Sequence, residues 1–144
     1  MRWLGLDLGE KTIGVAVSDE GEVVATPLRT LARQGGDRDL EAVAAVMREV
    51  GAGSVLVGLP LEMEGGEGDA ARGVRRFGER LAAHLGCPIH YWDERFSTVQ
   101  AERALLEADM RRRRRKQVID QVAATIILQS FLDRSQRAGE GEPA

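Results

Sequence analysis

The sequence predicts an α/β protein with a five-stranded mixed sheet and helices on both of its faces. Short apolar or β-branched segments alternate with segments in which apolar residues recur at helical spacing, in the order βββαβαβαα. Three strand-like segments come before the first helix, and tight turn signals join them as antiparallel neighbours. The later strands are separated by helices, and such crossovers make them parallel to the first strand.

The first three strands are expected over residues 2–8, 12–18 and 22–28. The segment 12–18 is rich in β-branched residues, which favour strands. Asp19-Glu20-Gly21 is a turn signal between the second and third strands. These residues should therefore form an antiparallel meander.

The middle of the chain supplies two helices and two strands. Apolar residues at helical spacing predict helices over 37–50 and 69–85. The run 54–59 is wholly apolar, as expected of a parallel strand buried on both faces, and Pro60 ends it. The fifth strand is expected over 87–92.

The C-terminal part predicts two further helices. Ser97 is placed to cap a helix that runs to about residue 108, and an apolar pattern predicts another helix over 118–132. The cations of 111–116 are expected to form a linker between them. Residues 1–133 then form one domain, and the polar, glycine-containing segment 134–144 is expected to be a flexible tail.

Composition favours a cytoplasmic protein. The net charge of the 144-residue chain is −3, so nucleic-acid binding would have to come from local clusters of cations. Cys87 is the single cysteine, which leaves no disulfide partner and fits a reducing compartment. No apolar run approaches the roughly 18 residues that span a bilayer, and no signal-peptide pattern is seen, so no membrane association is expected.

Acids stand at three places in the sequence where an apolar residue would be expected. Asp7 lies within an apolar strand, the pair Asp93 and Glu94 follows another strand, and Asp120 lies on the apolar stripe of a helix. An unpaired buried carboxylate costs several kcal/mol or has a raised pKa, so acids in such places call for a cation. Each has a simpler explanation: Asp7 could bond to the adjacent turn, Asp93 and Glu94 could be solvated at a strand end, and Asp120 could be favoured in the first turn of a helix. Together they suggest a divalent-metal site.

A basic run lies just before Asp120. By itself such a run is most simply a solvated linker, but at the rim of an acidic metal site it suits a phosphodiester substrate. Few aromatic residues are present, so no aromatic face for base stacking is expected and readout of base identity should be weak. The candidate nucleic-acid-binding residues of this run are Arg112, Arg113, Arg114, Arg115 and Lys116.

Four motifs in order resemble the YqgF/RuvX family of ribonuclease H-like proteins. They are LGLDLGEKTIGVAVSD at 4–19, VGLPL at 57–61, DERFST at 93–98 and VIDQVAA at 118–124, and the resemblance covers residues 2–133. Members are described as Holliday junction resolvases and as nucleases that mature precursor small-subunit ribosomal RNA. The resemblance implies a ribonuclease H-like fold and catalytic acids at Asp7, within the Asp93-Glu94 pair, and at Asp120.

The sequence departs from the related RuvC resolvases at the fourth strand, which in those proteins ends in an acid. Here the strand ends in Leu59-Pro60, so the second metal ligand has to come from the Asp93-Glu94 pair. Only one member of the pair can face a shared site. We favour Glu94 for its longer reach, with Asp93 orienting Arg95 or the following cap, or acting as the alternative ligand.

The resulting expectation is a nuclease in which Asp7, Glu94 and Asp120 bind Mg²⁺ or Mn²⁺. Lys11 and Arg95 are candidates to bind phosphate, and Ser97 could bind the backbone or cap its helix. The expected partner is nucleic acid, RNA before DNA, within a ribosome precursor. The alternatives are a resolvase acting on branched DNA, a non-catalytic adaptor with the same fold, or an actin- or sugar-kinase-like ATPase, for which the chain is too short. Monomer and homodimer both remain open.

Overall fold

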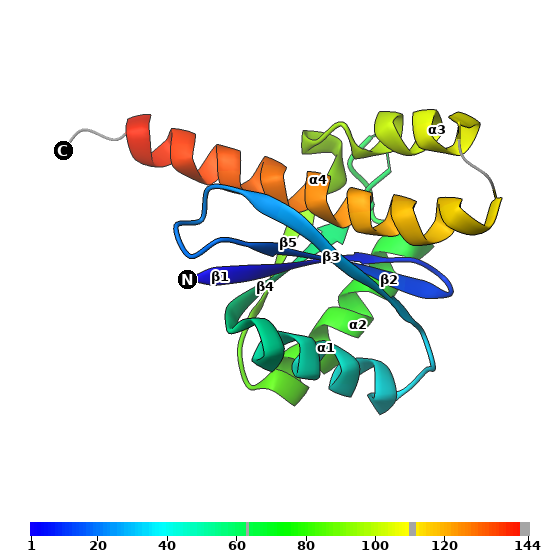
Figure 1. Ribbon diagram of the computed structural model, residues 1–144, viewed down its shortest axis with the longest axis horizontal. Helices are drawn as coiled ribbons and strands as arrows, with labels where there is room; N and C mark the ends of the chain where they lie inside the picture. The colour runs from blue at the N-terminus through cyan, green and yellow to red at the C-terminus, as the bar shows by residue number, and fades with distance from the viewer. Residues whose placement is uncertain (63, 110–111, 142–144) are drawn as a thin grey trace.

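The computed structural model describes residues 1–62, 64–109 and 112–141, and its centre is a mixed five-stranded sheet in the order β3-β2-β1-β4-β5 (Figure 1). β1 (Arg2–Leu8) lies in the middle, antiparallel to β2 (Thr12–Ser18) and parallel to β4 (Ala52–Leu59). β3 (Ala25–Ala32) pairs with β2 antiparallel, and β5 (Ile89–Asp93) pairs with β4 parallel. The predicted fold class and strand directions are confirmed.

Helices cover both faces of the sheet. α1 (Asp37–Val50) and α2 (Asp69–Leu85) lie on one face, and the long helix α4 (Arg112–Gly141) crosses the other (Figure 1). α3 (Val99–Asp109) packs beside α4, and a short 3₁₀ turn, η1 (Glu94–Phe96), joins β5 to it. Within the described part of the chain, no helix is both long and apolar enough to cross a membrane.

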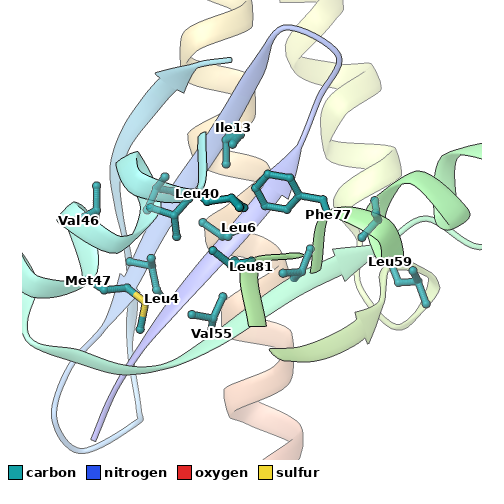
Figure 2. Close-up of a cluster of buried hydrophobic side chains, with 14 of the residues drawn as sticks. Leu4, Leu6, Ile13, Leu40, Val46, Met47, Val55, Leu59, Phe77 and Leu81 are labelled. Carbon is teal, nitrogen blue, oxygen red and sulfur yellow. The ribbon is translucent and has the colours of Figure 1, made fainter. Parts of the chain in front are cut away.

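The sheet separates two apolar cores. Figure 2 shows the first, in which side chains from β1 and β4 meet Leu40, Phe77 and Leu81 of the helices α1 and α2. The second lies between the sheet and α4. Alternate residues of a strand face opposite sides, so Val55 enters the first core while Leu56 enters the second. This is why β4 is apolar and buried from Val55 to Leu59, and each fully buried aliphatic side chain contributes roughly 1.5–3 kcal/mol.

Glycines let α4 approach the sheet very closely. A Cβ atom at Gly14 would lie 1.9 Å from the backbone oxygen of Asp120, and one at Gly5 would lie 2.9 Å from Cβ of Leu128. Gly14 is also the cross-strand partner of Asp7. The contact of helix and sheet therefore brings Asp120 to the same end of the sheet as Asp7.

Several predicted boundaries differ from the structure: β4 begins at Ala52 rather than at 54, and β5 covers Ile89–Asp93 rather than 87–92. Two larger differences have a clear physical cause. The third strand begins at Ala25 rather than at residue 22, because the Asp19 carboxylate accepts hydrogen bonds from the amides of Val23 (2.8 Å) and Val24 (3.0 Å) and holds them in the turn. The predicted linker over 111–116 is helical from Arg112 onward, and α4 continues through the expected tail to Gly141. Arginine and lysine are good helix formers, so a basic run readily extends a helix that follows it.

Candidate nuclease site

Two of the predicted acids, Asp7 and Glu94, meet on one arginine. Nη2 of Arg103 lies 2.5 Å from Oδ1 of Asp7, and Nη1 lies 3.2 Å from Oε1 of Glu94. Asp7 and Glu94 are only 5% and 3% exposed, whereas the Arg103 side chain is 30% exposed. A guanidinium reaching in from α3 thus pairs with two buried carboxylates, one from β1 and one from η1.

Burial dominates the electrostatics of this pair. Loss of solvent raises the pKa of Asp7 above its ordinary value of 3.8; Arg103 opposes the shift and the charge of Asp120 adds to it. Burial likewise raises the pKa of Glu94, with Arg103 opposing and Asp7 reinforcing the shift. Burial lowers the pKa of Arg103, but the two carboxylates outweigh this and raise it overall. Both acids are therefore in an environment that favours a bound cation.

The position of Glu94 follows from the pairing of β5 with β4. Asp93, the last residue of β5, is opposite Leu59, and Glu94 then turns inward beside Gly58. A Cβ atom at Gly58 would lie 3.4 Å from Cγ of Glu94, so glycine leaves room for this side chain. The acid that is absent from the end of β4 is thus replaced by one from the neighbouring strand.

Asp93 points elsewhere. Its carboxylate accepts a hydrogen bond from the backbone amide of Arg95 (2.9 Å) and forms an ion pair with the guanidinium of the same residue (2.7 Å). The hydrogen bond from the Arg95 side chain lowers the pKa of Asp93. Asp93 therefore caps η1, and the structure turns Glu94 alone toward Asp7.

Asp120 lies at the edge of the pair. Its carboxylate accepts a hydrogen bond from the hydroxyl of Thr12, and its charge raises the pKa of Asp7. Among the described side chains, however, no group of three acidic, histidine or cysteine residues is arranged closely enough to hold a metal ion. Of the three predicted acids, Asp7 and Glu94 therefore form a close pair, and Asp120 lies near them without joining it.

The other predicted residues fall into two groups. Lys11 is exposed on the β1–β2 turn and lines a pocket of about 240 Å³ with Thr12 and Asp120. Arg95 is held by Asp93, and the Ser97 hydroxyl donates to the Glu94 carbonyl (2.8 Å) and accepts from the Val99 amide (3.3 Å), so it has a local capping role. The side chains of Arg112, Arg113, Arg114, Arg115 and Lys116 lie outside the described part.

Arg103 is the functional residue that sequence reasoning missed. It lies in a helix with many charged residues and no distinctive pattern, 96 positions from Asp7. Two buried acids require a compensating positive charge, so their prediction from the sequence implies that some cationic side chain lies beside them. That implication does not say which of the chain's many arginines supplies it.

The residues present fit a divalent cation. Carboxylate oxygens are the ligands that Mg²⁺ and Mn²⁺ prefer. Oε1 of Glu94 is buried, and its charged partner among the described residues is the guanidinium of Arg103 at 3.2 Å. Two buried carboxylates that share a single guanidinium retain an excess of negative charge, which suits a metal ligand.

A mixed sheet in this strand order, with one acid near the end of its central strand and another just after its edge strand β5, defines the ribonuclease H-like class of proteins. Two solved structures of RuvC from Thermus thermophilus have this fold. One is in complex with a Holliday junction substrate, and both have TM-scores of 0.55 and cover 100% of each chain. Their sequence identity of 16% and 17% shows likeness of fold alone.

The chain belongs to the RuvX family, described as Holliday junction resolvase, whose profile matches residues 1–134. A relative from Moorella thermoacetica is 51% identical over 96% of this chain and 99% of its own, and one from Myxococcus xanthus is 53% identical over 92% and 88%. Each carries the name "Putative pre-16S rRNA nuclease". The expected family is confirmed, and with it the class of enzyme, a nuclease.

Proposed function

We propose that this chain is a metal-dependent nuclease that cleaves phosphodiester bonds of structured RNA in the precursor of 16S ribosomal RNA. The names of the relatives support the substrate, and the fold supports the chemistry. The observation that carries the proposal is the buried pair of Asp7 and Glu94, two carboxylates that share the single guanidinium of Arg103.

Asp7, Glu94 and Asp120 would hold Mg²⁺ or Mn²⁺. When bound, such ions activate a water molecule for in-line attack and stabilise the leaving oxygen. Asp120 would join the pair by exchanging its hydrogen bond with Thr12 for the ion. The three acids would come from β1, η1 and α4, so the site would form only in the folded chain.

The surrounding cations would position the substrate. Arg103 offsets part of the negative charge of the two acids in this structure, and its partly exposed guanidinium would contact a phosphate oxygen once another cation takes over that role. Lys11 lies beside Asp120 at the rim of the site and would bind the flanking phosphate. Residues 1–133 would form the nuclease domain, acting in the cytoplasm as a monomer or homodimer.

Cleavage assays test the proposal. Labelled precursor 16S RNA fragments, a four-way DNA junction and single-stranded DNA would each be incubated with the wild type and Asp7→Asn in Mg²⁺, Mn²⁺ or EDTA. We expect metal-dependent cleavage of the RNA, lost in Asp7→Asn and retained in Asp37→Asn, whose carboxylate is exposed on α1. Cleavage of the DNA junction alone would indicate a resolvase. Equal activity of Asp7→Asn and the wild type would refute the metal-ligand role.

A further inference from the structure

An exposed aromatic ring lies two residues from Glu94. Phe96 is 54% exposed, which is unusual for a phenylalanine beside a buried turn. Its ring centroid lies 5.5 Å from that of Trp92, which in turn lies 5.5 Å from that of Phe131. Phe96 is thus a single exposed ring backed by two partly buried aromatic side chains, where the sequence predicts no aromatic-rich face. This aromatic cluster combines β5 and η1 with α4, which is distant from them in the sequence.

Hydrogen bonds hold Phe96 in place. The indole N–H of Trp92 donates to the Ser130 hydroxyl (3.2 Å), and that hydroxyl donates to the Phe96 carbonyl (3.0 Å). The amide of Ser97 donates to the Glu94 carbonyl (3.1 Å) and closes the turn on the other side. The ring is therefore presented to solvent by a backbone that is fixed at both ends. Such preorganisation lowers the entropic cost of binding a ligand on it.

Two arginines of α4 accompany the ring. The guanidinium carbon of Arg134 lies 4.6 Å from the Phe96 ring centroid and 5.9 Å from that of Trp92. Arg134 and Arg137 line a cavity of about 440 Å³ together with Phe96 and Ser130. Neither guanidinium forms an ion pair with a carboxylate among the side chains that the structure describes. Among the described side chains, this aromatic cluster and its two guanidiniums therefore present positive charge without a carboxylate partner, which suits a ligand of negative charge.

We propose that Phe96, Arg134 and Arg137 form a subsite that binds one unpaired nucleotide of the nucleic acid. The base stacks on the part of the Phe96 ring that the Arg134 guanidinium leaves exposed, with that guanidinium at its edge, and Arg137 binds the adjacent phosphate. This chemistry fits a nucleotide better than a protein surface or a membrane, because one aromatic ring with two guanidiniums offers too little apolar area for either. The proposal rests on the proposed function, since it places this nucleotide on the substrate strand.

The subsite should distinguish unpaired from paired nucleotides. In a duplex, both faces of a base are covered by its neighbours, so Phe96 cannot reach them. An unpaired base has a free face. Phe96 follows Glu94 by two positions in the chain, so the proposal implies a substrate whose strand is single close to the place of cleavage.

Fluorescence anisotropy with a labelled eight-nucleotide single-stranded RNA, and with a blunt duplex of the same sequence, tests this in EDTA, where cleavage does not interfere. We expect Phe96→Ala to weaken binding of the single strand by about tenfold and of the duplex by less than twofold. Phe96→Tyr should keep near-wild-type affinity, and Arg134→Ala should weaken single-strand binding severalfold. Leu105→Ala, which removes another exposed apolar side chain (64%), is the matched control and should change neither affinity.

Three results would overturn the subsite. They are an unchanged affinity of Phe96→Ala, an equal loss for single strand and duplex, or a change of oligomeric state in Phe96→Ala, which would make the patch a contact between copies. The two proposals can fail separately. Phe96-dependent binding of RNA by a wild-type protein that does not cleave would leave the subsite in place and remove the nuclease. Metal-dependent cleavage together with an unchanged RNA affinity of Phe96→Ala would support the nuclease and refute the subsite.

Discussion

Gly14 of β2 lies directly against the backbone of Asp120 in α4, closer than any side chain would permit. Since Gly14 is also the cross-strand partner of Asp7, this one residue sets the separation of two candidate metal ligands. The hydroxyl of Thr12, two residues earlier on the same strand, fixes the direction of the Asp120 carboxylate. β2 thus contributes no acid to the site and yet positions one of them.

Gly14→Ala should therefore damage both stability and activity. The new methyl group would fall 1.9 Å from the Asp120 oxygen, so α4 would have to move away from the sheet. Overpacking of this kind costs about 1–3 kcal/mol or more in the free energy of unfolding. Urea denaturation and cleavage assays would measure the two effects. Gly66→Ala is the control, since nothing lies within 4 Å of a Cβ atom there, and a similar loss of stability in both variants would contradict this explanation.

Asp7→Asn should change how stability depends on pH. The pKa of Asp7 is raised in the folded protein, so the folded state binds more protons than the unfolded state above the ordinary value of 3.8. Wild-type stability in EDTA should then fall as the pH rises from 3.8 through the raised pKa, by about 1.4 kcal/mol for each pH unit between the two pKa values. Thermal denaturation across this range should show the variant gaining stability relative to the wild type. A constant difference between the two would contradict a raised pKa.

Arg103→Ala should destabilise the metal-free protein and increase its response to metal. Without the guanidinium, Asp7 and Glu94 face each other as uncompensated buried charges, and we expect a loss of about 2–3 kcal/mol. Mn²⁺ should restore more stability to this variant than it adds to the wild type, because the ion no longer competes with an arginine. Melting temperatures with and without Mn²⁺ would show this. Arg38→Ala, on the exposed surface of α1, serves as the matched control.

Glu94→Gln should lose Mn²⁺ binding, while Asp93→Asn should retain it. The Glu94 carboxylate shares the Arg103 guanidinium with Asp7, whereas the Asp93 carboxylate pairs with the Arg95 guanidinium and caps η1. Asp93→Asn should instead cost about 1 kcal/mol of stability through the weakened cap. Isothermal titration calorimetry with each variant decides between them. Loss of binding in Asp93→Asn alone would reverse the assignment.

Replacing residues 112–115 with serine should weaken binding of nucleic acid and flatten its dependence on salt. The backbone of these residues belongs to the start of α4, a few positions before Asp120. Each phosphate contact that is lost should lower the slope of log affinity against log salt by roughly 0.7–0.9. Anisotropy titrations at several salt concentrations measure the slope. An unchanged slope would mean that the run is a solvated helical surface.

Most of the fold could be predicted because its signals are local. The strands at 2–8 and 12–18 and the helices at 37–50 and 69–85 match the structure residue for residue. The third strand was misplaced because the side chain of Asp19 bonds to two amides of the turn, which periodicity does not reveal. The helical start of α4 was missed because a run of cations carries no apolar stripe.

The candidate site was less predictable than the fold, because some of its residues are brought together only by contacts between segments distant in the sequence. Asp7 and Glu94 stand out in the sequence as acids at strand ends, but Arg103 has no local signal. The aromatic cluster was missed for the same reason, since Phe96 and Arg134 are brought together only by the packing of α4 against η1. Residues that act through partners distant in sequence become visible only when the elements are assembled.

β1 has hydrogen-bonded neighbours on both sides and apolar cores above and below it. Amide protons in such a strand exchange with solvent only when the whole domain unfolds. Asp7 is thus immobilised by the most protected element of the molecule, and the conformational entropy of placing it is lost during folding rather than during encounter with a substrate. Any adjustment that a bound ion requires has to come from the periphery, where Arg103 and Asp120 are carried by helices. The central strand of the sheet therefore holds Asp7 in a fixed position, and the outer helices carry the side chains that can move when an ion binds.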